Sequence, residues 1–377
     1  MPQRIILCTV LIYVYATFCL AAVKPPSPQQ LKPVLKDAAQ TSLSDWKHQR
    51  KEIIDQWIMA LGKPEGYDYA PEQKVVEEFE TIDFKGVIYL QRTGPESYQK
   101  VLLMTPLNLK TPAPGVIIPF YHPDGVCGYD LQNKTRKTAD RNATYFGLHL
   151  VKQGYVVASC EAYPFNLIPL PAECKNRDDF KLWQFAADFL NKRYPSWTGM
   201  GKLTYDTRKA IDLLVSSGLA DTNKIAIMGH SLGGKMAFYT GCMDDRIKVV
   251  IGNDFGIGWD FTNWSSPWYF GDKLKIMRKN GLEHHQLLAC KAPAPFLLIG
   301  GEYDHDGSWA YINGARKVYD LYNAGNNIDF INHKSGHHPS WEALNRAYLW
   351  LAEKLEIPKP DLEFLNELKQ QQLQLNK

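Results

Sequence analysis

Apolar residues first recur at helical spacing just after residue 44, with one face formed by Trp46, Ile54, Trp57, Ile58 and Leu61. Gly62 follows this pattern directly, which predicts an amphipathic helix that ends at the glycine. Three short β-type runs come next, KVVEEFE, GVIYLQR and KVLLMTP, separated by Gly, Pro and Ser. They predict antiparallel strands that open a sheet.

Further along the chain, short apolar runs alternate with helical patterns. The apolar runs are PGVIIPFYH, YVVASCEAYP, KIAIMGHS, IKVVIGND, PFLLIGGEYD and NIDFINH. The helical patterns lie near 141–153, 202–217, 232–243, 308–324 and 340–355. Doubly apolar strands that alternate with helices predict an α/β fold, with a mostly parallel sheet covered on both faces.

Two segments, 161–201 and 255–290, are too long for simple connections and are rich in aromatic residues and proline. We expect them to form lids or pocket walls. The second segment contains four large rings, Trp259, Trp264, Trp268 and Tyr269. Exposed together, these rings would favour aggregation, so they must pack into the body or line a cleft. Because the segment leaves the carboxyl end of a strand, we expect at least one ring to bind substrate.

The ends of the chain differ from its body. Residues 1–22 carry one charge, Arg4, before an apolar run that ends in small residues, which is typical of a secretory signal peptide. This predicts a secreted or periplasmic protein, with an uncleaved membrane anchor as the alternative. Residues 23–43 are predicted to be a flexible lead-in, 44–357 a single domain and 358–377 a tail.

The composition excludes several classes of protein. The chain has 43 Lys and Arg against 40 Asp and Glu, without a clustered basic run, which argues against nucleic-acid binding. Its 45% hydrophobic and 22% charged residues are typical of a globular protein. No second apolar stretch is long enough to span a bilayer, so no membrane partner is expected once the signal is cleaved.

The cysteines and histidines lack the spacing of a metal site, so neither a metal nor another cofactor is expected. Five cysteines follow the signal: Cys127, Cys160, Cys174, Cys242 and Cys290. Up to two disulfides are allowed, and at least one cysteine stays unpaired within the chain. Buried, small apolar side chains are the favoured interpretation.

The clearest chemical motif is Gly229-His230-Ser231-Leu232-Gly233, between the strand KIAIM and a helical pattern. This context predicts a nucleophile elbow, in which the glycines permit a tight turn and the serine hydroxyl stands above the sheet. The backbone N–H of Leu232 would then point at a developing oxyanion.

A serine hydroxyl needs a base and an acid to act as a nucleophile, and in this fold both follow the serine along the chain. Asp304, just past the strand PFLLIGG, is the favoured acid. Asp306 lies two residues later in the same loop, and Asp254 ends the earlier strand IKVVIGN. Both remain alternatives.

The base is expected in the loop INHKSGHHPSW, after the last strand. His337 is favoured because it follows a glycine in a flexible turn. His333 lies close to the strand end, where local hydrogen bonding is expected. His338 is restricted by the proline that follows it.

A second oxyanion donor is expected in the loop after PGVIIPF. Either Tyr121 or His122 can offer its backbone N–H there, and Asp124-Gly125 supplies the turn.

Together, GHSLGGK, GGEYDHDGSW and NHKSGHHP resemble the α/β-hydrolase superfamily. The stretches WKHQRKEIIDQW, RYPSWTGMGKLTYDTRKAIDLL and DDRIKVVIGNDFGIGWDFTNWSSPWYFG resemble its secreted branch of dienelactone-hydrolase-like and acetyl-xylan-esterase-like proteins. The resemblance covers roughly residues 44–355 and implies a serine carboxylesterase. The chain departs from this branch in two ways: its elbow holds Ser where dienelactone hydrolases have Cys, and PFYHPDG replaces the usual HGGG or HGxG loop.

Ester hydrolysis through an acyl-enzyme is therefore the leading hypothesis, with a small-molecule or carbohydrate ester as the substrate. The aromatic rings of the second insertion favour a carbohydrate acyl ester. A serine peptidase related to the prolyl oligopeptidase catalytic domain is the alternative. A non-catalytic binding module is disfavoured, because no member of the triad is missing.

Overall fold

The computed structural model describes residues 31–35, 41–63, 72–95, 97–110, 112–137, 142–176 and 179–375. The expected signal peptide, residues 1–22, lies outside the described residues. In the part of the chain that is described, we find no helix both long enough and apolar enough to cross a membrane.

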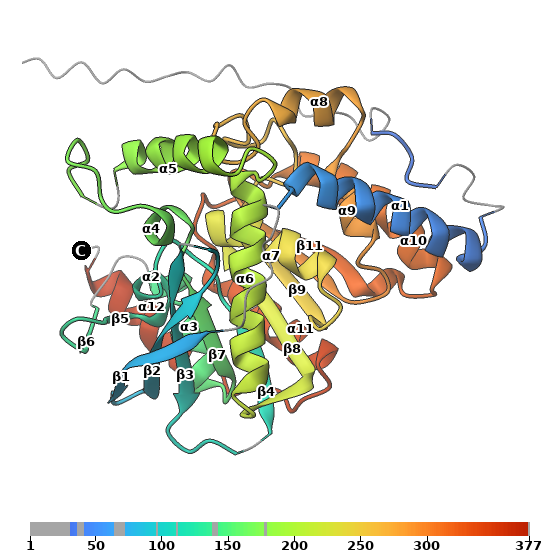
Figure 1. Ribbon diagram of the computed structural model, residues 1–377. Coiled ribbons are helices and arrows are strands. Elements are labelled where there is room, and N and C mark those ends of the chain that lie inside the picture. Colours follow the sequence, from blue (N-terminus) through green and yellow to red (C-terminus); the bar gives the residue numbers. More distant parts are fainter. Residues whose placement is uncertain are drawn as a thin grey trace, which may run out of the picture.

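A nine-stranded sheet forms the centre of the molecule (Figure 1). Its order is β1 (Gln73–Glu80), β2 (Phe84–Arg92), β3 (Tyr98–Pro106), β7 (Val156–Cys160), β4 (Ala113–Ile117), β8 (Ala220–His230), β9 (Val249–Asn253), β10 (Phe296–Gly300) and β11 (Ile328–Asn332). The pairs from β1 to β7 are antiparallel, and those from β7 to β11 are parallel. The predicted antiparallel opening and parallel body are both confirmed. A separate hairpin joins β5 (Tyr129–Asp130) and β6 (Thr135–Arg136).

Helices cover both faces of the sheet (Figure 1). One core is shared with α1 (Leu43–Leu61), α5 (Phe180–Arg193), α6 (Gly199–Ser216), α7 (Leu232–Met243), α9 (His284–Ala289) and α10 (Trp309–Leu321). The opposite core is shared with α3 (Phe146–Lys152), α11 (Trp341–Lys354) and α12 (Glu363–Leu375). Successive side chains of a strand enter opposite cores, as Leu102 and Leu103 do in β3. Three short helices complete the fold: α2 (Asp124–Cys127), α4 (Pro164–Leu167) and α8 (Lys273–Lys279).

Parts of the two end segments belong to the packed body. Val34 and Leu35, in the segment expected to be a flexible lead-in, are 4% exposed. In the tail, Leu365 and Leu368 of α12 are buried in the same core as α11. Each contribution consists of two apolar residues, which is too short a pattern to distinguish a docked segment from a loose one.

The five cysteines after residue 22 are all buried free thiols. This agrees with the favoured interpretation of small apolar side chains. The disulfides that the sequence allowed are not formed.

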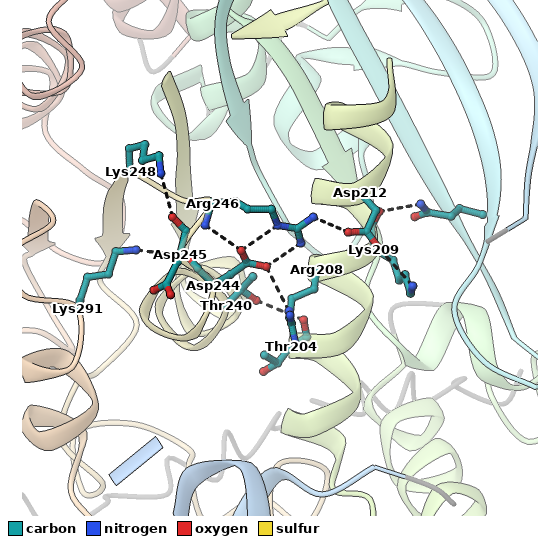
Figure 2. A network of polar contacts seen from close by, with 11 residues as sticks. Thr204, Arg208, Lys209, Asp212, Thr240, Asp244, Asp245, Arg246, Lys248 and Lys291 are labelled. Carbon is teal, nitrogen blue, oxygen red and sulfur yellow. Dashed lines mark hydrogen bonds and ion pairs between the residues drawn. The ribbon is translucent and has the colours of Figure 1, made fainter. Parts of the chain in front are cut away.

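An ion-pair network holds the turn between α7 and β9 against α6 (Figure 2). Arg246 donates to both carboxylate oxygens of the buried Asp244, at 2.7 and 2.9 Å, and also to Asp212 on α6, at 2.6 Å. Arg208 donates to Asp244 at 3.2 Å. The chain that leads into β9 is therefore held in a fixed position relative to α6.

This network predicts a pH-dependent contribution to stability. Burial would raise the pKa of Asp244, but hydrogen bonds and charge from Arg246, with the charge of Arg208, outweigh it and bring the pKa to about 2 from an ordinary value of 3.8. Asp244→Asn should therefore lower the free energy of unfolding by about 2 kcal/mol at pH 7. The stabilisation is present above the unfolded-state pKa and disappears as the pH falls through the folded-state pKa.

Urea unfolding of both proteins between pH 7 and pH 2 measures the effect. The difference should persist down to about pH 4 and shrink towards pH 2. Asp245→Asn is the matched control, because the Asp245 side chain is 88% exposed and should contribute little. A difference that does not change with pH would contradict the assignment.

Candidate active site

Ser231 occupies a strained turn between β8 and α7, with φ 54° and ψ −116°. A residue with a side chain rarely adopts a positive φ, and such strain costs about 1–3 kcal/mol. The turn is held because Ser231 N–H donates to Asn253 O, at 2.8 Å, on the neighbouring strand β9. The side chain of Ser231 is partly exposed at the N-terminus of α7.

The two glycines of the motif are required by close backbone contacts. A Cβ on Gly229 would lie 2.0 Å from Gly233 O, and one on Gly233 would lie 2.1 Å from Pro119 O. Neither contact is possible for a real side chain. The second one also places the loop after β4 directly against the first turn of α7, so the expected elbow geometry is present.

His337 is held by Asp254, not by Asp304. Its Nδ1 donates to Asp254 Oδ2 at 2.7 Å, and the two residues lie in the loops after β11 and β9. The His337 ring packs 4.4 Å from the ring of His230, the residue that precedes Ser231. The expected serine and histidine are thus brought to the same edge of the sheet, and the acidic side chain is Asp254, one of the two alternatives that the sequence left open.

The remaining oxygen of Asp254 is occupied by backbone donors. Asp254 Oδ1 accepts the N–H groups of Gly301, Glu302 and Asp304 at 3.1, 3.1 and 2.8 Å. Burial would raise the pKa of Asp254, but the hydrogen bond from His337 and these backbone bonds lower it below its ordinary value. Asp254 is therefore an ionised carboxylate at neutral pH, as a partner for an imidazolium requires.

Asp304 lies in the adjacent turn, and its carboxylate bonds to groups other than His337. Its carboxylate accepts Gly256 N–H and Ile257 N–H, both at 2.8 Å, and the hydroxyl of Ser308 at 2.9 Å. Burial and the nearby charge of Asp254 raise the pKa of Asp304 to about 7. The turn after β10 is so tight that a Cβ on Gly300 would lie 2.2 Å from Asp304 O. The expectation that Asp304 contacts the histidine is wrong.

The other candidates of these loops have local partners. Asp306 is exposed and accepts from Asn332 and Lys334 at 2.8 and 3.0 Å. His333 Nδ1 lies 2.7 Å from Ser335 Oγ, the local bonding that the sequence predicts. The ring of His338 lies 5.5 Å from the ring of His230.

Both candidates for the second oxyanion donor lie in the loop packed against the elbow. The Tyr121 carbonyl accepts Ala162 N–H at 3.2 Å, and the His122 carbonyl accepts Gly125 N–H at 3.0 Å. The His122 ring lies 4.0 Å from Phe165 in α4. These contacts fix the loop but do not distinguish the two N–H groups.

Three of the four rings in the second insertion are buried. Trp259 donates to Leu282 O and Trp264 donates to Gly256 O, at 2.9 and 2.6 Å, while Tyr269 is 3% exposed. Trp268 is only partly buried. Its ring lies 6.2 Å from Trp183, which in turn lies 5.7 Å from Tyr121. Of the four, Trp268 combines partial exposure with a continuous ring contact to the loop at the elbow.

Lys235, one turn into α7, was not among the predicted site residues. It is 3% exposed, donates to Asn263 Oδ1 at 2.8 Å, and lies over the Trp264 and Tyr269 rings at 4.6 and 4.7 Å. Burial lowers the pKa of Lys235 to about 7, although the charge of Asp304 acts in the opposite direction. The sequence shows this lysine beside the motif, but a helical position alone does not reveal its burial.

Tyr303 was also missed. Its ring packs edge-on against His337 at 4.8 Å and borders the site from the β10 loop. The described residues contain no group of three or more side chains arranged to hold a metal ion.

The chain is similar to several known proteins. Residues 198–356, less than half of the chain, match the sequence model of the prolyl oligopeptidase family, Peptidase_S9. The carbohydrate esterase MZ0003 from an unknown prokaryotic organism is 25% identical over 149 residues, which are 34% of this chain and 34% of that protein. A second relative, hydrolase YtaP from Bacillus subtilis (strain 168), is 39% identical over 51 residues, which are 14% of this chain and 17% of that protein. The chain therefore matches only 17% and 34% of the length of these two curated relatives.

Solved structures resemble almost the whole described body. A glucuronoyl esterase from Solibacter usitatus has a TM-score of 0.64 at 17% identity, covering 86% of this chain and 97% of that one. A structure assigned as an acetyl xylan esterase, from Bacteroides fragilis NCTC 9343, has a TM-score of 0.65 at 16% identity, covering 83% and 81%. The chain therefore has the α/β-hydrolase fold that its motifs predict, and in fold it resembles these two esterases.

Proposed function

We propose that this protein is a serine hydrolase that cleaves carboxylic esters. Ser231 is the nucleophile, His337 is the general base and Asp254 is the acid that orients it. The observation that carries the proposal is the 2.7 Å bond from His337 Nδ1 to Asp254, formed beside the strained turn of Ser231. A bond at Nδ1 leaves Nε2 free of its proton, which is the tautomer that can accept the serine proton.

The reaction follows the two steps of serine esterases. Ser231 attacks the carbonyl carbon while His337 takes its proton, and the same histidine then protonates the leaving alcohol. The N–H of Leu232, with that of Tyr121 or His122, stabilises the oxyanion. Water, activated by His337, releases the acid from the acyl-enzyme.

A carbohydrate ester is the proposed substrate class. Support comes from the similarity to carbohydrate esterases in both sequence and structure. The partly exposed Trp268 offers a ring on which a sugar can stack. The apolar segment 1–22 supports a secreted location, where such substrates occur.

Peptide hydrolysis is the second candidate, supported by the match of residues 198–356 to the prolyl oligopeptidase family. The same triad serves both reactions. Purified protein should be assayed against acetylated, feruloylated and methyl-esterified sugars, simple nitrophenyl esters, and proline-containing peptides. Turnover of peptides without turnover of esters would replace the proposed function by this alternative.

The first prediction concerns the nucleophile. Ser231→Ala should reduce kcat/KM for an ester substrate by about 10³-fold or more, because the elbow presents no other nucleophile. The variant should unfold at the same temperature as the wild type or above it, because removal of the hydroxyl leaves the backbone of the strained turn unchanged. Substantial activity in a clean preparation of Ser231→Ala would disprove the triad.

The second prediction concerns the acid. Asp254→Asn should lower kcat by about 10²- to 10⁴-fold, because an amide does not stabilise the imidazolium and can favour the wrong tautomer. Asp306→Asn is the matched control, since its carboxylate is exposed and accepts from Asn332 and Lys334. Equal activity of the two variants would rule out Asp254.

The third prediction concerns the aromatic wall. Trp268→Ala should raise KM for a bulky sugar ester several-fold and leave a small acetyl ester nearly unaffected, because the small substrate does not reach the ring. Trp350→Ala is the control, a partly buried ring on α11, which packs on the opposite face of the sheet. Equal effects of Trp268→Ala on both substrates would show that this ring serves only packing.

A further inference from the structure

Asp254 and Asp304 bind each other's loops. Asp304 N–H donates to Asp254 Oδ1 at 2.8 Å, while the Asp304 carboxylate accepts the N–H groups of Gly256 and Ile257 at 2.8 Å. Each aspartate therefore caps the backbone of the segment that carries the other. Both side chains are fully buried.

The loop after β9 needs such a restraint. Asp254 has φ 42° and Gly256 has φ 70°, so two residues in the left-handed region follow closely on the end of the strand. A residue with a side chain holds this conformation only when its surroundings impose it. Two of the restraints are the hydrogen bonds that Gly256 and Ile257 give to Asp304.

The arrangement is costly on electrostatic grounds. Two carboxyl groups are buried close together, and the charge of Asp254 disfavours ionisation of Asp304. A neutral side chain would avoid this repulsion but would not accept two backbone donors and a hydroxyl at once. The buried carboxylate of Asp304 is therefore matched to three donors, one of them Ser308.

We propose that Asp304 is a positioning residue for the reaction at Ser231. Its carboxylate fixes the loop of residues 254–257, and this loop presents Asp254 Oδ2 to His337. Asp304 does not contact the substrate or the imidazole. The proposal rests on the function proposed above, because Asp254 must be the acid for its placement to affect turnover.

A graded series of variants tests this role. Asp304→Ala removes all three acceptor bonds, Asp304→Asn keeps an acceptor for only part of the set, and Ser308→Ala removes one bond. Displacing a catalytic group by about 1 Å can cost about 10²-fold in rate. We therefore expect kcat to fall by about 100-fold, 10-fold and 3-fold in this order, with KM for a small acetyl ester changed less than about twofold. Asp306→Asn, on the same turn, should match the wild type.

A second measurement does not depend on activity. The proton in the bond from His337 Nδ1 to Asp254 should give a downfield NMR signal that is absent from Asp254→Asn and His337→Ala. We expect this signal to be weakened by faster exchange in Asp304→Asn and retained in Asp306→Asn. A variant that only lost stability would keep the signal at temperatures well below its unfolding transition.

The outcomes separate this proposal from the proposed function. Normal kcat and an unchanged signal in folded Asp304→Asn would overturn the positioning role, even if Ser231→Ala is inactive. A weakened signal in a protein that cleaves no ester would support the positioning role and reject the esterase. If Asp304→Asn does not fold, Ser308→Ala decides: reduced kcat with a weakened signal supports the proposal, and wild-type behaviour in both overturns it.

Discussion

The carboxylate of Asp254 is the point on which the geometry of the site depends. It accepts a side-chain bond from His337 and three backbone bonds from the turn after β10, so one buried group joins three loops from neighbouring strands. The loop of His337 follows the outermost strand of the sheet, β11, and contains Gly336 at φ 92°. Without an anchor such a loop would have several accessible positions. The anchor selects the one beside the elbow.

Burial makes the protonation of Asp254 and Asp304 depend on the hydrogen-bond donors around each of them. In a medium of low polarity a carboxylate remains charged only where donors surround it, and a like charge nearby favours protonation of the less well supported group. Asp254, with a histidine and three N–H donors, has a lowered pKa, while burial and the charge of Asp254 raise that of Asp304 to about 7. The two residues therefore differ in how strongly their surroundings support the charged form, although both are equally inaccessible. This difference comes from their hydrogen-bond partners and not from their burial.

The sequence predicts what local sterics dictate. Gly229 and Gly233 are identifiable because only glycine fits between backbone atoms about 2 Å from a would-be Cβ, and the strand and helix around them follow from periodicity. The aspartate that bonds to His337 was not predictable in this way. Asp254 and Asp304 each follow a strand that ends at the same edge, and the choice between them depends on how two turns fold. The contact of Gly300 with the Asp304 carbonyl, which directs that turn, is not encoded in any periodic pattern.

For the aromatic insertions too, the sequence does not show which rings are buried. The structure also shows that the two insertions hold each other in place. Four rings predicted a packed or cleft-lining segment, but only the structure separates the buried Trp264 from the partly exposed Trp268. Tyr163 O–H donates to Trp268 O at 3.1 Å and Met200 N–H donates to Tyr269 O at 2.8 Å, so the insertions 161–201 and 255–290 are bonded to each other at two places.

Close packing makes this connection firm. A Cβ on Gly199 would lie 1.8 Å from Trp268 O, so the backbones of the two insertions touch without an intervening side chain. Neither insertion can swing outward without breaking its bonds to the other, and the wall is formed before any ligand arrives. A preformed wall selects ligands by shape, because no conformational entropy is lost in ordering the wall when a ligand binds. Under the proposed function, substrate selectivity should therefore depend on the outline of the ring surface around Trp268 and not on closure of a lid.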